Sequence, residues 1–216
     1  MPEGRPGSLR GSVQGSLFGG LETVEPGPLA AAHRTELTEG AWLDVLPGWL
    51  SGADELFDRL AGTVPWPAER RWMYDRVVDV PRLLSFYDEL DPLPDPALTE
   101  ARSALSRHYR HELGEPFRTA GLCFYRDGRD SVAWHGDTIG RGGKEDTMVA
   151  ILSLGAPRML LLRPRAGGRT IRRSLGSGDL LVMGGSCQRT WEHAVPKTTR
   201  STGGRISVQF RPRGVR

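Results

Sequence analysis

The chain contains few cysteines and no long apolar run. Cys123 and Cys187 are the two cysteines among 216 residues, which is too few for a disulfide framework, so we expect a reduced, cytoplasmic environment. No apolar run approaches the roughly 20 residues of a membrane helix, and no apolar segment follows the N-terminal residues to form a secretory signal. The sequence therefore predicts a cytoplasmic protein without a membrane partner.

The composition is that of a globular protein rich in turns. Hydrophobic residues make up 38% of the chain and charged residues 25%, and the length is sufficient for one domain with a sizeable core. The 28 glycines and 16 prolines favour short strands and turns over long helices.

Charge is distributed unevenly along the chain. Residues 1–116 contain 11 Lys and Arg against 19 Asp and Glu, whereas residues 117–216 contain 18 against 7. A basic half is expected of a protein that binds a polyanion such as nucleic acid. A solubilising surface rich in arginine gives the same excess, so charge alone leaves both interpretations open.

The first half of the chain is predicted to be helical after a mobile tail. Residues 1–16 have almost no large apolar side chains and cannot offset the entropy of ordering, so we expect them to be mobile. Residues 17–115 are predicted to contain the N-terminal helices, and residues 35–49 resemble the approach to the first of these. This region and the following one are expected to form one compact unit from residue 17 to residue 213.

Two helices are predicted in that region. The first covers residues 51–61, with Ser51 as its N-cap and acidic residues in its first turn. The second covers residues 95–113, with Asp95 as its N-cap and a proline in its first turn. Its apolar stripe recurs at helical spacing and consists of Leu98, Ala101, Leu105 and Tyr109.

From residue 118 the hydrophobic period changes to two, which is typical of strands. Glycine-rich turns separate eight candidate strands, and such spacing suggests a β-sandwich, jelly roll or barrel over residues 116–213. The predicted class is therefore mainly β with supporting helices. The candidate strands lie near residues 118–126, 131–137, 147–154, 158–163, 170–175, 179–183, 190–195 and 205–211.

Three residues have the chemistry of a metal site. His135 and Asp137 are two residues apart, so in a strand they point in one direction. With the more distant His193 they make the set of two histidines and one carboxylate that binds non-haem iron(II) in oxygenases.

The last candidate strand carries two arginines on one face. Arg205 and Arg211 are six residues apart and share a face with the polar residues between them, while Ile206, Val208 and Phe210 face the opposite way toward a core. An arginine beside an iron site would bind the carboxylate of an acidic co-substrate through a two-pronged contact.

These motifs, with the sequence around them, resemble the AlkB family of iron(II)- and 2-oxoglutarate-dependent dioxygenases, which reverse alkyl damage on nucleic-acid bases. The resemblance covers most of residues 121–211 in family order, and the first half of the chain resembles the family only loosely. The matching stretches are residues 125–137, 153–155, 178–185, 188–197 and 205–211.

The resemblance implies a double-stranded β-helix, or jelly-roll, core preceded by a helical region that contains a substrate lid. It implies that His135, Asp137 and His193 bind Fe(II) and that dioxygen and 2-oxoglutarate occupy the open iron positions. It further implies that Tyr125, Arg205 and Arg211 surround 2-oxoglutarate, with Arg205 on its distal carboxylate and Arg211 near the metal-binding aspartate.

The resemblance also implies an activity and a partner. The expected reaction is oxidative demethylation of alkylated bases in DNA, or in RNA, with release of formaldehyde, succinate and CO2. A base inside a duplex cannot reach a buried iron, so the substrate is expected to be single-stranded or flipped out. The alternatives are an oxygenase that acts on a protein or small molecule, and a non-catalytic nucleic-acid-binding β-protein. We expect a monomer.

Candidate base-binding residues are aromatic. Phe86 and Tyr87 lie where the lid of the family begins, and Trp191 is two residues before His193. Phe86 and Tyr87 fit a core position equally well, whereas Trp191 shares the face of His193 and is predicted to line the pocket. The chain departs from the family pattern at Cys123, where an asparagine is usual, and at Ile139, where several members have an acidic residue that contacts the base.

Overall fold

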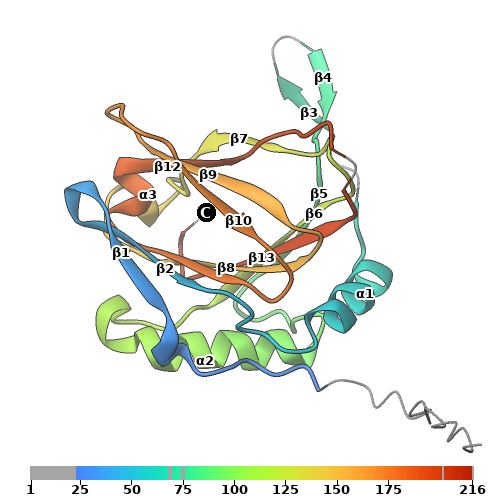
Figure 1. Ribbon diagram of the computed structural model, residues 1–216, viewed down its shortest axis with the longest axis horizontal. Coiled ribbons are helices and arrows are strands. Elements are labelled where there is room, and N and C mark those ends of the chain that lie inside the picture. Colours follow the sequence, from blue (N-terminus) through green and yellow to red (C-terminus); the bar gives the residue numbers. More distant parts are fainter. Residues whose placement is uncertain (1–22, 68–69, 74–75, 201, 216) are drawn as a thin grey trace, which may run out of the picture.

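Two antiparallel β-sheets form the body of the protein in the computed structural model (Figure 1). The structure describes residues 23–67, 70–73, 76–200 and 202–215, so the tail expected at residues 1–16 lies outside the described residues. The sheets face each other as the two layers of a jelly roll (Figure 1). The predicted fold class, mainly β with supporting helices, is confirmed.

The larger sheet has seven strands and draws on both halves of the chain. Every neighbouring pair in it is antiparallel. Its strands, in spatial order, are β1 (His33–Glu36), β2 (Ala41–Leu46), β11 (Leu180–Gly185), β8 (Val149–Gly155), β13 (Arg205–Arg211), β6 (Thr119–Tyr125) and β5 (Leu83–Tyr87).

The smaller sheet has four strands, and β7 is one of its edges. Its spatial order is β10 (Ile171–Leu175), β9 (Arg158–Pro164), β12 (Trp191–Val195) and β7 (Val132–His135). A separate hairpin of β3 (Arg70–Met73) and β4 (Arg76–Asp79) extends beyond both sheets (Figure 1). Short 3-10 turns cover Leu29–Ala31, Thr38–Gly40 and Arg141–Gly143.

Alternation along the central strands separates two cores. On β13, Ile206, Val208 and Phe210 are fully buried in the core between the larger sheet and the helices. Apolar residues on the other face of this sheet pack against the smaller sheet, as Ile151 and Leu162 do. The functional face of β13 therefore points into the space between the two sheets, as its sequence predicts.

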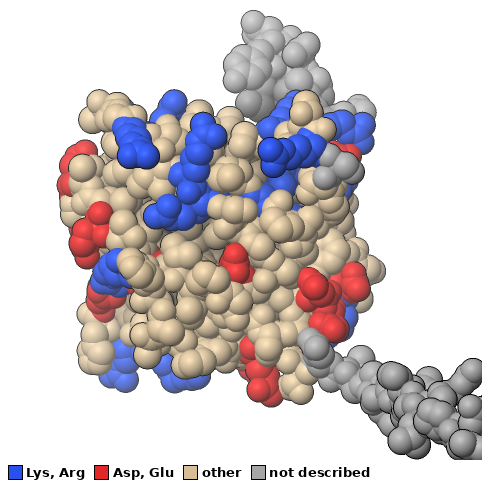
Figure 2. Space-filling view, viewed as in Figure 1, with Lys and Arg blue, Asp and Glu red and all other residues tan. Residues whose placement is uncertain are grey.

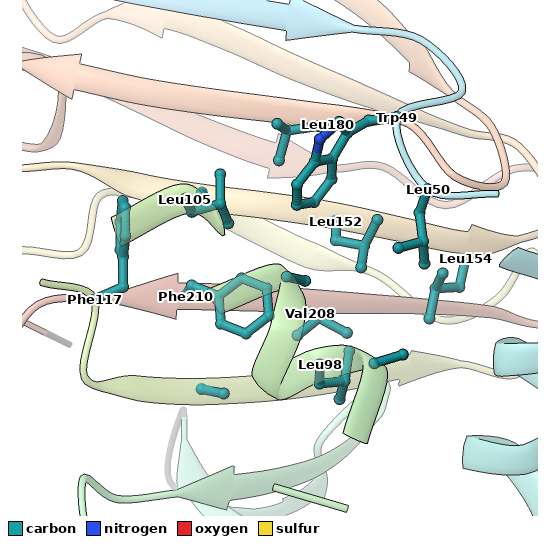
Figure 3. Packing of buried hydrophobic residues seen from close by; sticks show 14 of the residues in the cluster. Trp49, Leu50, Leu98, Leu105, Phe117, Leu152, Leu154, Leu180, Val208 and Phe210 are labelled. Atoms are coloured by element: carbon teal, nitrogen blue, oxygen red, sulfur yellow. The ribbon is translucent and has the colours of Figure 1, made fainter. Parts of the chain in front are cut away.

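Helix α2 (Pro96–Leu113) covers the outer face of the larger sheet (Figure 1). Asp95 caps it by accepting a hydrogen bond from the backbone N–H of Ala97, as predicted. The predicted stripe is buried, and Figure 3 shows Leu98 and Leu105 beside Phe210 and Val208 of the sheet. None of the helices in the described residues has the length and hydrophobicity of a membrane span.

Helix α1 (Ala53–Thr63) begins later than predicted. Its N-cap is Gly52, whose φ of 60° is left-handed, and not Ser51. The Ser51 hydroxyl instead donates to the backbone carbonyls of Thr23 and Glu25 in the incoming segment. The predicted core residues of this helix, Leu56 and Leu60, are fully buried.

Residues 35–49 precede helix α1, as predicted, but they form strands that the sequence did not reveal. They include the second half of β1 and all of β2, which pairs with β11 in the larger sheet. β2 is buried on both faces at its start, so it lacks the alternation that reveals a strand. Its buried carboxylate, Asp44, accepts hydrogen bonds from Arg34 and from the Tyr109 hydroxyl of α2.

Candidate active site

The three predicted metal-binding residues converge between the sheets. His135 ends β7 and lies directly opposite His193 of β12, with their ring centroids 4.3 Å apart. Asp137 follows β7 by two residues, and one possible ligand atom from each residue lies within 4.8 Å of the others. The set has the composition and the convergence that iron(II) requires.

A hydrogen bond fixes the orientation of the His135 ring. Its Nδ1 lies 2.9 Å from the carbonyl oxygen of Ala133. A carbonyl only accepts, so Nδ1 must carry the proton and donate it. In the neutral ring the lone pair is then on Nε2, which lies 3.9 Å from Oδ1 of Asp137 and faces the site.

Asp137 is buried and held by two partners. Nε of Arg211 donates to its Oδ2 at 2.6 Å, and its backbone N–H donates to the side-chain oxygen of Gln188 at 2.9 Å. Burial alone would raise the pKa of Asp137, but the charge of Arg211 lowers it to about 2. The carboxylate is therefore ionised, and Oδ1 remains directed toward the histidines.

His193 is buried more deeply than His135. Burial, and then the neighbouring His135, lower the pKa of His193 to about 3. Its imidazole is therefore neutral at physiological pH, which is the form that binds a metal ion.

Glycine is required between the two neighbouring candidate ligands. A Cβ at Gly136 would lie 2.6 Å from the backbone oxygen of Gln188 and 3.2 Å from that of Trp191. Gln188 belongs to the short helix α3 (Cys187–Thr190), which directly precedes β12. The segment with His135 and Asp137 can approach the strand with His193 only because residue 136 has no side chain.

A cavity of about 400 Å³ opens beside the three residues. Its size falls within the range of small-molecule sites, which is about 300–1,000 Å³. Both β13 arginines line it, with strand residues from both sheets and the exposed side chain of Ile139. The predicted site residues among its walls are Phe86, Tyr125, His135, Asp137, His193, Arg205 and Arg211.

Arg205 has unused binding capacity at the end of this cavity. It is 1% exposed, and its Nε donates to the hydroxyl of Ser153 at 2.9 Å. Its Nη1 has no hydrogen-bond partner among the described residues, and no carboxylate of these residues pairs with it. A buried guanidinium without a counterion is unfavourable, so this position suits the carboxylate of a bound acid.

Tyr125 lies beside Arg205, whose guanidinium carbon is 5.4 Å from the tyrosine ring centroid. Burial raises the pKa of Tyr125 above its usual range. The hydroxyl therefore keeps its proton and is available to donate a hydrogen bond into the cavity. These residues fit an acidic co-substrate anchored next to a metal ion.

The three aromatic candidates for base binding lie in different places. Phe86 lines the cavity and is 43% exposed. Tyr87, the next residue of β5, packs against the core on the opposite side of the sheet, so it does not border the cavity. Trp191 is 4% exposed in the core between the sheets and lies outside the cavity wall. Strand alternation predicts that Trp191 shares the face of His193. Trp191 instead lies next to α3, and its Nε1 donates to the carbonyl oxygen of Thr38 at 3.4 Å.

Several residues at the site were not among the predicted site residues. Gln188 and Ser153 lie in stretches that match the family, but no role was predicted for them. The Gln188 side chain accepts a hydrogen bond from the backbone N–H of Asp137, and the Ser153 hydroxyl accepts one from Arg205. Arg82 lines the cavity with a buried Nε that lacks a partner among the described residues. Cys123, at the departure from the family pattern, lies 3.6 Å from the side-chain oxygen of Gln209 and also faces the cavity.

Basic side chains gather over the smaller sheet in the view of Figure 2. The guanidinium carbon of Arg163 in β9 lies 4.1 Å from the ring centroid of Trp134, which is half-buried. Glu192 accepts from Arg163 at 2.6 Å and lies 3.9 Å from Arg165. The exposed guanidinium of Arg169 follows in the turn after β9.

Comparison with known proteins agrees with this geometry. Residues 43–211 match the family model described as the 2OG-Fe(II) oxygenase superfamily. The chain therefore belongs to this superfamily, whose name implies iron(II) and 2-oxoglutarate, with dioxygen as the oxidant. His135, Asp137 and His193 form a triad that suits the iron.

Within the superfamily the chain is similar to AlkB proteins, which confirms the resemblance found in its motifs. "Alpha-ketoglutarate-dependent dioxygenase alkB homolog 3" of Bos taurus is 32% identical over 194 residues, covering 78% of this chain and 66% of the relative. The Homo sapiens protein of that name is 30% identical over 186 residues, or 75% and 64%. "DNA oxidative demethylase ALKBH2" of Arabidopsis thaliana is 32% identical over 139 residues, or 54% and 43%. The chain spans just under two thirds of the length of the alkB homolog 3 proteins it matches.

Proposed function

We propose that this protein is an Fe(II)- and 2-oxoglutarate-dependent demethylase of alkylated bases in DNA. The observation that supports this proposal is the convergence of two imidazoles and one carboxylate, within 4.8 Å, at a cavity lined by a buried arginine that has no carboxylate partner among the described residues. A nucleic-acid-binding protein without catalysis needs none of these groups together. RNA is the second substrate candidate of the same chemical class.

Three side chains are proposed to hold the iron: His135 through Nε2, Asp137 through Oδ1, and His193. When bound, iron(II) with 2-oxoglutarate and dioxygen supplies the oxidising chemistry that hydroxylates an N-methyl group. The chain keeps the ligands in their binding forms through the Ala133 carbonyl, Arg211 and the burial of His193.

The co-substrate is proposed to lie between the metal ligands and Arg205. Its distal carboxylate would take the free Nη1 of Arg205 as a donor, and the protonated hydroxyl of Tyr125 would donate a second hydrogen bond. Arg211 is proposed to act mainly on Asp137, because its Nε already donates to that carboxylate.

The methylated base is proposed to enter single-stranded or flipped out of a duplex. The metal ligands lie inside the fold, with Asp137 and His193 buried, so a stacked base cannot reach them. Phe86 is proposed to stack on the base, because its ring lines the cavity and is partly exposed. The basic side chains over the smaller sheet would contact phosphates, and a monomer suffices for this arrangement.

Two measurements with purified protein test the proposal. Succinate and formaldehyde are quantified with iron(II), 2-oxoglutarate and N-methylated single-stranded DNA. Unmethylated DNA, methylated duplex DNA and methylated RNA serve as comparison substrates. Formaldehyde that depends on the methyl group and on iron supports the proposal, and the comparison substrates rank DNA, RNA and strandedness.

The variant His135→Ala is expected to abolish this turnover while the thermal unfolding transition remains. His111→Ala is the matched control, because His111 is exposed on α2 and far from the candidate ligands in sequence. Activity of His135→Ala equal to wild type would reject the metal-ligand assignment. Turnover of 2-oxoglutarate without formaldehyde from any nucleic acid would favour a protein or small-molecule substrate, and no iron-dependent turnover would favour a binding protein.

A further inference from the structure

A second cavity lies at the junction of α2 and the segment that leads into β6. It has a volume of about 320 Å³ and shares no lining residue with the cavity beside the metal ligands. Its walls come from α2, from the residues just before β6, and from Glu89 in the turn after β5. The cavity is therefore a separate feature of the surface.

The charge of this cavity is strongly unbalanced. Three arginines line it, namely Arg102, Arg107 and Arg118, and Glu89 is the one carboxylate among the described residues of its wall. Glu89 is already shared, because it pairs with Arg118 at 3.0 Å and accepts from Nε of Arg213 at 2.8 Å. Glu89 therefore compensates Arg118 and Arg213, and no described carboxylate of the wall pairs with Arg102 or Arg107.

Arg102 is the residue that the fold compensates least. It is half-buried, and its Nη1 donates to the backbone carbonyl of Arg118 at 2.8 Å. That acceptor is neutral, and no carboxylate pairs with Arg102 in the part of the chain that the structure describes. Burial, followed by the charge of Arg118, lowers the pKa of Arg102. An anion between these groups would remove the repulsion and provide the missing acceptors.

The donors are held on a rigid element. Arg102 and Ser106 are four residues apart on α2, and Ser103 and Arg107 repeat the same spacing, so all four line one stripe of the helix. Ser106 connects α2 to the segment before β6. Its hydroxyl donates to the backbone carbonyl of Arg102 and accepts from the backbone N–H of Phe117. The cavity therefore has a preformed shape, which lowers the entropic cost of binding.

We propose that this cavity is an anion-binding site for a phosphate-bearing ligand, distinct from the catalytic cavity. The planar donor groups of Arg102 and Arg118 match phosphate oxygens in pairs. The volume exceeds the lower end of the range for small-ligand sites, about 300 Å³. The phosphate belongs either to the backbone of a bound nucleic acid or to a free nucleotide or polyphosphate.

Inorganic pyrophosphate is the probe for the test. Its binding is measured by isothermal titration calorimetry on the full, metal-free chain at low salt, with excess 2-oxoglutarate present to occupy the buried Arg205. Saturable binding is expected in the wild type. Arg102→Gln and Arg118→Gln are each expected to weaken it by about tenfold or more, because each removes a charge-assisted donor.

Arg110→Gln is the matched control, because Arg110 is exposed on the same helix but does not line the cavity. It is expected to bind pyrophosphate like the wild type. Because the Arg118 side chain is exposed, its replacement is expected to leave the fold intact, and thermal melts of both variants check that a loss of binding is not due to misfolding. The proposal is overturned by an absence of saturable binding in the wild type, or by an equal loss in Arg110→Gln.

The same variants identify the source of the phosphate. If the ligand is a nucleic-acid backbone, Arg102→Gln and Arg118→Gln also lose affinity for an unmethylated single-stranded oligonucleotide, and pyrophosphate competes with it. If the ligand is a free nucleotide or polyphosphate, oligonucleotide affinity is unchanged in both variants. Both results support the site. The test needs neither iron nor turnover, so its outcome is independent of the proposed demethylase activity.

Discussion

The two arginines on the polar face of β13 share a cavity but have different partners. Arg211 donates to the carboxylate of Asp137, so its charge is compensated within the protein. Arg205 donates from Nε to a neutral hydroxyl, and its Nη1 has no partner among the described residues. Arg211 is therefore a positioning residue for Asp137, whereas Arg205 is free to bind an incoming anion.

The variant Arg205→Ala is expected to raise the KM for 2-oxoglutarate by about 10- to 100-fold, because a charge-assisted contact contributes about 1.5–3 kcal/mol. Initial rates of succinate formation over a range of 2-oxoglutarate concentrations measure the effect. Arg169→Ala is the control, because it removes the same charge from an exposed turn. An unchanged KM in Arg205→Ala would place the co-substrate anchor elsewhere.

The variant Gly136→Ala is expected to weaken metal binding by about 10- to 100-fold, the range seen when ligand-supporting contacts are lost. The new Cβ would meet a backbone oxygen at 2.6 Å and push His135 and Asp137 away from β12. Titration with Mn(II) measures the affinity, and a thermal melt reports the fold. Gly62→Ala is the control, because nothing lies within 4 Å of a Cβ there. Equal affinities would show that the segment adjusts without cost.

The sequence predicted the candidate metal ligands because their chemistry is rare and their spacing is defined by strand alternation. Trp191 shows that strand alternation alone does not place a side chain at the cavity. It has the same parity as His193, but it lies where β12 leaves α3 and packs between the sheets. Tyr87 and Phe86 are neighbours with opposite directions, and only knowledge of the sheet faces shows which one borders the cavity.

Helix α2 packs against the outer face of the larger sheet, opposite the cavity beside the candidate metal ligands. Leu98 is fully buried against this sheet (Figure 3). Leu98→Ala is expected to reduce the free energy of unfolding by about 2–5 kcal/mol. Urea denaturation measures the change. Thr99→Ala, at the exposed neighbouring position, is expected to stay within about 0.5 kcal/mol of wild type. If Leu98→Ala reduces the free energy of unfolding by less than about 0.5 kcal/mol, the helix has moved to fill the space left by the leucine side chain.

Strands with one apolar and one polar face were predictable, and the strands missed by the prediction lack this pattern. β13 alternates between core residues and cavity residues, so its limits were predicted closely. β2 has four consecutive buried residues, one of which is Asp44, whose charge is compensated by Arg34. That compensation is a tertiary contact, which no local pattern in the sequence reveals.

The larger sheet is built from strands of both halves of the chain. The predicted core at residues 116–213 contributes only four strands to the seven-stranded sheet, and its β11 and β6 pair with β2 and β5 from the first half. An isolated 116–213 fragment would expose the unpaired edges of both strands and the apolar face that α2 covers. We expect no cooperative thermal transition from the fragment by circular dichroism. A transition as sharp as that of the full chain would show that the second half folds alone.

His135 and His193 lie opposite each other on two neighbouring strands, so an ion bound at the candidate site would join these strands. β7 is an outer strand with one neighbour, and its ladder with β12 shifts register just beyond this pair. An ion bound by both imidazoles would therefore hold β7, an edge strand, in place against β12. Deuterium uptake by the β7 amides is therefore expected to slow when Mn(II) is added and to be unchanged in β8, which lies in the centre of the other sheet. Equal uptake in β7 with and without the ion would show that the strand is already secured by its hydrogen bonds alone.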